Sequence, residues 1–119
     1  MTAQPTSFAL FAYRQEPGCF IHVLLNGLDL HDKGHKVKIV IEGPATTLLP
    51  EIETLDAPLP SLFKQATDKG LMDGYCLACA TKLGAKDGAK ASGLAPLSDM
   101  NGHPSMARYV EQGFTVINF

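Results

Sequence analysis

Two of the three cysteines in this chain lie close together in the sequence. Cys76 and Cys79 belong to segment 75–84, YCLACATKLG, where an apolar run typical of a strand gives way to small residues typical of a helix start. Backbone N–H groups at the start of a helix stabilise a thiolate, which is the reactive form of cysteine. The spacing therefore predicts a reactive thiol pair, with Cys79 or Cys76 as the nucleophile, that performs redox, sulfur or metal chemistry.

The sequence leaves other interpretations of this pair open. Cys76 falls near the end of the predicted strand, where a free cysteine often packs as a small hydrophobic side chain. No Cys-Gly-Pro-Cys sequence is present, which disfavours a thioredoxin-type oxidoreductase. A structural zinc ion normally takes four ligands and the chain has no second Cys-x-x-Cys pair, so we expect no metal, with a Cys76/Cys79/His103 zinc site as the alternative. Cys19 is expected to pack in the core.

Strand-like and helix-like segments alternate along the whole chain. Strands are predicted over residues 8–13, 36–42, 71–77, 94–97 and 114–119. Helical segments are predicted over residues 17–32, 45–54, 62–69 with Ser61 as the cap, 78–91 with interruptions at Gly84 and Gly88, and 104–112. This alternation is typical of an α/β domain, in which a parallel sheet of about five strands carries helices on both faces.

Polar residues just beyond the strands complete the candidate site. Ligands of parallel sheets bind beyond the carboxyl ends of the strands, and residues 76–79 follow the third predicted strand. Arg14 follows the first strand, Glu42 ends the second and His103 lies in the loop after the fourth. Arg14 and His103 are candidates to supply positive charge beside a thiolate, and Glu42 is a candidate proton acceptor. Each also has a plain interpretation as a solvated polar side chain.

Length and charge limit the class of protein. The chain has 119 residues and is expected to form one domain, residues 1–119, with a hydrophobic core. Its net charge of −2 and lack of a basic cluster argue against nucleic acid as a partner. No apolar run approaches the roughly 20 residues of a membrane span, and residues 1–7 lack the features of a signal peptide. We therefore expect a cytoplasmic protein with reduced thiols.

The cysteine loop, CLACATKLG, and the terminal GFTVINF resemble the DsrE/DsrF-like family. The resemblance implies a flavodoxin-like three-layer α/β/α fold with a mostly parallel sheet, and a cytoplasmic sulfur-relay role in which a cysteine accepts and passes on a persulfide sulfur. In relay members that cysteine lies eight residues before the glycine corresponding to Gly84, which is Cys76 here. In others it lies five residues before, which is Cys79 here. The resemblance also implies a homo-oligomer, as a trimer or hexamer, and a sulfur donor or acceptor protein as partner.

Two further features bear on ligands and partners. The glycines form no GxGxxG or P-loop pattern, so we expect no flavin or nucleotide cofactor. Charged residues make up 18% of the chain, below the roughly 25% typical of soluble domains, and the apolar stretch 48–63 is a candidate interface between subunits. The alternative to a sulfur-handling protein is a non-catalytic module for a small ligand or a protein, with structural cysteines.

Overall fold

A single sheet organises the chain. The structure, a computed structural model, describes residues 6–119, so part of the segment that argued against a signal peptide lies outside the described residues. The strands are β1 (Ser7–Ala12), β2 (Lys36–Ile41), β3 (Met72–Cys76), β4 (Pro96–Leu97) and β5 (Thr115–Asn118). They lie in the order β4-β3-β2-β1-β5, and every neighbouring pair is parallel. The predicted α/β class and five-stranded parallel sheet are confirmed.

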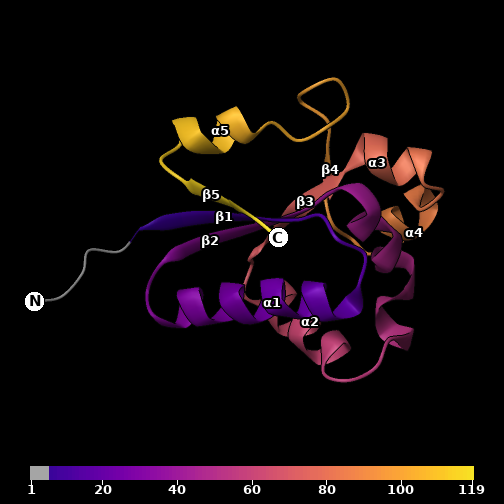
Figure 1. The fold of residues 1–119 in the computed structure, drawn as a ribbon, viewed down its shortest axis with the longest axis horizontal. Helices are drawn as coiled ribbons and strands as arrows, with labels where there is room; N and C mark the ends of the chain where they lie inside the picture. The colour runs from indigo at the N-terminus through magenta and orange to yellow at the C-terminus, as the bar shows by residue number, and fades with distance from the viewer. Residues whose placement is uncertain (1–5) are drawn as a thin grey trace, which may run out of the picture.

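Helices connect the strands and cover both faces of the sheet, in a flavodoxin-like three-layer arrangement (Figure 1). They are α1 (Pro17–Asp32), the 3₁₀ helix η1 (Gly43–Thr54), α2 (Leu59–Asp68), α3 (Leu77–Lys82), α4 (Lys86–Ala91) and α5 (Met106–Glu111). Helices α1 and α2 lie on one side of the strands and α5 on the other. Within residues 6–119, no helix is long and apolar enough to cross a membrane.

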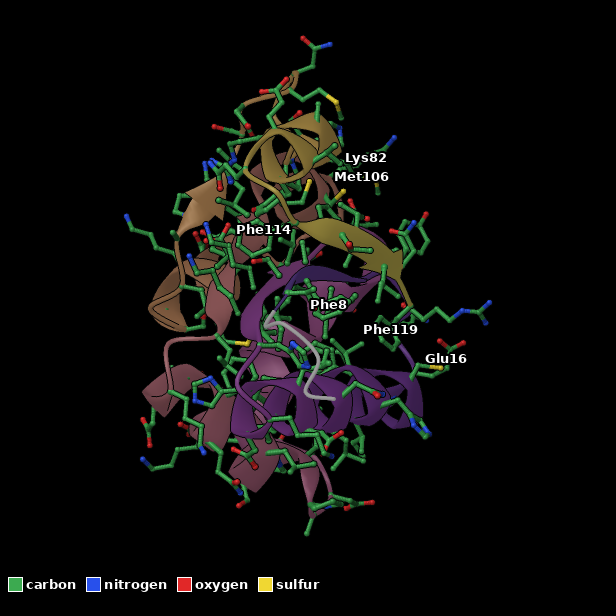
Figure 2. The ribbon with its side chains drawn as sticks, turned by 90° about the vertical axis from the view of Figure 1, so that its left-hand side faces the viewer. Phe8, Glu16, Lys82, Met106, Phe114 and Phe119 are labelled. Carbon is green, nitrogen blue, oxygen red and sulfur yellow. The ribbon has the colours of Figure 1, made fainter. Side chains whose placement is uncertain are left out.

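Alternating side chains of the central strands supply two hydrophobic clusters. Leu10 of β1 and Ile39 of β2 point to the face covered by α1, η1 and α2. Their neighbours Ala9 and Val40 point to the opposite face, where Tyr109 of α5 and Phe114 cover them. Figure 2 shows Phe114 beside α5 and the strands. Both faces are buried because a strand sends successive side chains in opposite directions and each crossover must cover one face.

Several boundaries differ from the prediction for identifiable reasons. Segment 43–54 is a 3₁₀ helix rather than an α-helix. It contains Pro50, which has no backbone N–H to donate to an α-helical hydrogen bond. Ser61 does not cap a helix, because α2 already begins at Leu59 and accommodates Pro60 in its first turn, where no N–H is needed. The 78–91 helix is interrupted at Gly84 but not at Gly88, which lies within α4. A Cβ atom at Gly88 would lie 2.4 Å from Pro50, so this glycine allows α4 to approach η1.

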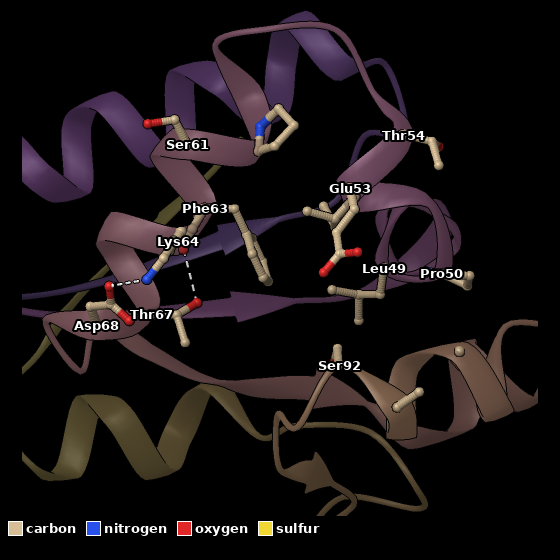
Figure 3. A pocket seen from close by; sticks show the side chains of 14 residues that line it. Leu49, Pro50, Glu53, Thr54, Ser61, Phe63, Lys64, Thr67, Asp68 and Ser92 are labelled. Atoms are coloured by element: carbon tan, nitrogen blue, oxygen red, sulfur yellow. Dashed lines mark hydrogen bonds and ion pairs between the residues drawn. The ribbon is translucent and has the colours of Figure 1, made fainter.

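The apolar stretch 48–63 has an explanation within the chain. Four of its large apolar side chains are buried in the core, Leu48, Leu49, Ile52 and Leu59, whereas Leu55, Leu62 and Phe63 are half-buried. A groove of about 760 Å³ runs beside them between η1, α2 and α4, with the Lys64–Asp68 ion pair at 2.8 Å along its wall (Figure 3). Among residues 6–119, no cysteine and no histidine lines this groove, so it is separate from the chemistry predicted at the strand ends.

Candidate functional site

The ends of β2 and β3 bring the first three candidate residues to one edge of the sheet. Ile41 pairs with Tyr75 in the parallel register, so Glu42 and Cys76 are the next residues on adjacent strands. Cys76 is the last residue of β3 and also the N-cap of α3, and Cys79 lies in the first turn of that helix. The helix start predicted at the cysteine pair is thus confirmed, and it is what folds the two thiols back toward each other.

A tight turn in the loop after β4 brings His103 next to the cysteines. Met100 and His103 exchange backbone hydrogen bonds of 2.8 and 2.9 Å around Asn101 and Gly102, whose φ angles are 49° and 89°. Positive φ at both central residues is the signature of a type I′ turn, for which Asn-Gly is the preferred sequence. The Gly102 carbonyl accepts a 2.8 Å hydrogen bond from the backbone N–H of Ala78. The turn is therefore attached directly to the start of the cysteine helix.

The two thiols and the imidazole converge on one point. His103 Nδ1 lies 3.1 Å from Cys76 Sγ and 3.6 Å from Cys79 Sγ. The backbone N–H of Cys79 donates to Cys76 Sγ at 3.3 Å. All three side-chain atoms lie within 4.8 Å of one another. The structure thus brings together Cys76, Cys79 and His103, which are separated by up to 27 residues in the sequence.

The two cysteines differ in how far their side chains are exposed to solvent. Cys76 has no exposed surface, whereas Cys79 is half-buried. Burial, followed by the interaction with the Cys79 side chain, raises the pKa of the Cys76 thiol from 9.0 to about 12, and the nearby Glu42 carboxylate contributes, whereas the Cys79 backbone N–H acts in the opposite direction. Cys76 is therefore a neutral thiol at neutral pH, and Cys79 is the thiol that a molecule from solvent can reach.

Glu42 lies within electrostatic range of Cys76 and of His103. Partial burial raises the pKa of its carboxyl, and the charge of His103 acts in the opposite direction. Its backbone N–H donates to the Ala12 carbonyl at 2.9 Å, which holds it at the edge of the sheet. Glu42 therefore lies where its charge affects the Cys76 thiol, and its role as a proton acceptor stays a prediction.

The loop that carries His103 is held by residues that the sequence analysis did not single out. Asp99 accepts a 3.2 Å hydrogen bond from the Ser105 backbone N–H and pairs with Arg108 Nε at 3.5 Å. Arg108 Nη2 also lies 3.4 Å from Asp73 of β3, and the Tyr109 hydroxyl donates to the same carboxylate. These contacts fasten α5 and the loop to the sheet. The Asn-Gly dipeptide was the available signal for the turn, but no sequence pattern identifies the aspartates.

Two other candidate residues lie apart from the cluster. Arg14 is exposed, and no ion pair or side-chain hydrogen bond within residues 6–119 joins it to the cysteines or to His103. Cys19 is half-buried near the start of α1 and does not belong to either hydrophobic cluster, so its predicted place in the core is wrong. The helix leaves Cys19 next to the exposed Gly18, one position before the buried Phe20.

The chemistry open to this arrangement follows from its atoms. An imidazole nitrogen close to two thiols can accept a proton from either sulfur and so generate a thiolate. Adjacent thiols can exchange a disulfide or pass on a sulfane sulfur. Two sulfurs and one nitrogen are also ligands that zinc prefers.

Comparison with known proteins identifies a relative of this chain but indicates no activity. No protein-family model matches the sequence, and no solved structure matches it. Uncharacterized protein MJ0733 of Methanocaldococcus jannaschii is 30% identical over 115 residues, which cover 93% of this chain and 92% of that protein.

Proposed function

We propose a function from the site itself, because the chain belongs to the same family as the archaeal protein MJ0733, whose name states no activity. The proposal is a cytoplasmic sulfur carrier of the DsrE/DsrF-like kind that holds a persulfide sulfur on Cys79. The observation that carries it is the convergence of Cys79, Cys76 and His103 at the carboxyl edge of the sheet, with His103 Nδ1 3.6 and 3.1 Å from the two sulfurs.

Sulfur loading follows from the different exposure of the two thiols. His103 accepts the proton of the Cys79 thiol, and the resulting thiolate attacks the outer sulfur of a donor persulfide, R–S–SH. The donor S–S bond breaks as the new S–S bond to Cys79 forms. The donor leaves as a thiolate and takes the proton back from the imidazolium. The products are R–SH and Cys79–S–SH, so atoms, protons and electrons balance.

Two routes unload the sulfur. The thiolate of an acceptor protein can attack the outer sulfur and regenerate Cys79. Alternatively, Cys76, after losing its proton to His103, attacks Cys79 Sγ, which releases hydrosulfide and leaves a Cys76–Cys79 disulfide. In that second route the two thiols are oxidised and the sulfane sulfur is reduced, and a dithiol reductant must restore the pair. The raised pKa of Cys76 keeps this thiol protonated, which favours holding the sulfur until an acceptor arrives.

Intact mass after incubation of the reduced protein with a persulfide donor tests the proposal. We expect a gain of one sulfur atom, about 32 Da, on the wild-type chain. The gain should be lost in Cys79→Ser and retained in Cys76→Ser. Cys19→Ser is the matched control, because Cys19 is also a half-buried cysteine but lies outside the cluster. No adduct on the wild type, or an adduct that survives Cys79→Ser, would contradict the assignment of Cys79.

The proposal includes self-assembly into a homo-oligomer and a donor or acceptor protein as partner. Three apolar side chains around α5 and the edge strand β5 are exposed, namely Met106, Val110 and Ile117. Exposed apolar side chains on neighbouring elements are typical of an interface. Size-exclusion chromatography with light scattering should give a mass above 12.7 kDa, and a monomer at high concentration would refute this part.

A further inference from the structure

The three converging side chains can bind a metal ion as well as hold a sulfane sulfur. With a Zn–S bond of about 2.3 Å and a Zn–N bond of about 2.0–2.1 Å, tetrahedral coordination places sulfur and nitrogen about 3.6 Å apart. The Cys79 Sγ–His103 Nδ1 distance is 3.6 Å, and the Cys76 Sγ–His103 Nδ1 distance is 3.1 Å. The two sulfurs lie within 4.8 Å of each other, against about 3.8 Å in a tetrahedral site, so side-chain shifts of up to about an ångström bring all three atoms to bonding distance of a common point. We propose that Cys76, Cys79 and His103 bind one zinc ion.

The backbone around the cluster suits metal-bound thiolates. The Cys79 N–H that donates to Cys76 Sγ favours the charged form of that sulfur. The N-cap position of Cys76 and the type I′ turn before His103 fix two of the three ligands on tightly hydrogen-bonded backbone. Ligands held in place by the backbone lose little conformational freedom when they bind a metal ion, which increases the affinity.

The coordination shell leaves one position free. Among the described residues, these three are the group of histidine, cysteine and acidic side chains whose ligand atoms converge closely enough to hold a metal ion. Three protein ligands with an open fourth position are typical of zinc sites that bind a small exchangeable molecule, whereas structural sites use four. The fourth position is left to a solvent molecule. Zinc and sulfane sulfur then compete for Cys79.

Cobalt(II), a spectroscopic substitute for zinc, is the probe that tests this site. Titration of the reduced wild-type chain with cobalt(II) should produce the visible absorption of a tetrahedral site together with thiolate-to-cobalt charge-transfer bands. Both should saturate at one ion per chain and disappear when zinc(II) is added. Cys79→Ser and His103→Asn should each weaken binding by at least about tenfold, because each removes a ligand. Cys19→Ser should bind as the wild type does, and circular dichroism establishes that every variant is folded.

Several results would overturn the zinc site. These are the absence of charge-transfer bands, octahedral cobalt spectra, binding that survives His103→Asn, or equal loss in Cys19→Ser. Sulfur loading is measured separately, by mass and in the presence of a chelator, so a failure of either proposal is recognised without reference to the other. If both hold, zinc added before the persulfide donor should prevent the gain of sulfur on Cys79.

Discussion

The protonation state of Cys76 decides which thiol starts the chemistry, and it can be measured directly. Burial and the neighbouring groups raise its pKa from 9.0 to about 12. At pH 8 the thiolate fraction falls from about one in ten for a free thiol to about one in 10⁴ in the folded chain, because each pKa unit changes the ratio tenfold. The variant Cys19→Ser/Cys79→Ser leaves Cys76 as the titrating cysteine. Burial, the largest cause of the shift, remains in that variant.

Ultraviolet absorption of the thiolate reports this ionisation independently of solvent access. The variant is titrated with base in the presence of a chelator. The triple variant Cys19→Ser/Cys76→Ser/Cys79→Ser gives the tyrosine contribution, which is subtracted. We expect no thiolate signal below about pH 10 in the folded state and an ordinary signal near pH 9 in denaturant. A thiolate step below about pH 8 would refute the reasoning. It would mean that His103 and Cys76 form an ion pair and that Cys76 is the nucleophile.

Three further substitutions test how the site is held. Gly102→Ala places a Cβ atom 3.1 Å from that of Ala78 at a φ of 89°, so it should lower the free energy of unfolding by about 1–3 kcal/mol in urea titrations and slow sulfur loading. A wild-type loading rate would contradict the role of the turn. Tyr109→Phe removes the hydroxyl that donates to Asp73 and should cost about 1–3 kcal/mol in the same assay, since the ring still fills its place. An unchanged unfolding midpoint would show that this hydrogen bond does not stabilise the fold. Burial raises the pKa of Glu42 in the folded chain, so its ionisation costs stability as pH rises through that pKa. Glu42→Gln should therefore raise the melting temperature at pH 7 and not well below pH 4.5, whereas an equal gain at both pH values would contradict the assignment.

The sequence was sufficient to predict the alternation of the elements because this alternation depends on local patterns. The apolar runs around Phe11 and Val40 and the glycines at helix ends identify strands and helices with little error. Helix type and exact ends depended on packing instead. η1 is a 3₁₀ helix that contains Pro50, and α2 begins at Leu59 with Pro60 in its first turn.

The burial of individual side chains was less predictable from the sequence. Segment 48–63 was predicted as an interface because it is apolar, and four of its large side chains are buried in the core of the same chain, while Phe63 is half-buried. Cys19 was expected in the core but lies on a partly exposed side of α1. A side chain's burial depends on which elements cover it, and the order of the strands, with β5 beside β1, is not encoded in any single segment.

The sequence by itself determined that Cys76 and Cys79 share a strand end and a helix start, since this depends on residues within one short segment. Only the tertiary structure decided what surrounds them. It places His103 within 3.1 Å of Cys76 through an Asn-Gly turn attached to the cysteine helix, and it leaves Arg14 exposed and outside the cluster. The physical reason is that local propensity fixes backbone direction over a few residues. The meeting of side chains from separate strands depends on sheet order, register and the packing of the loops between them.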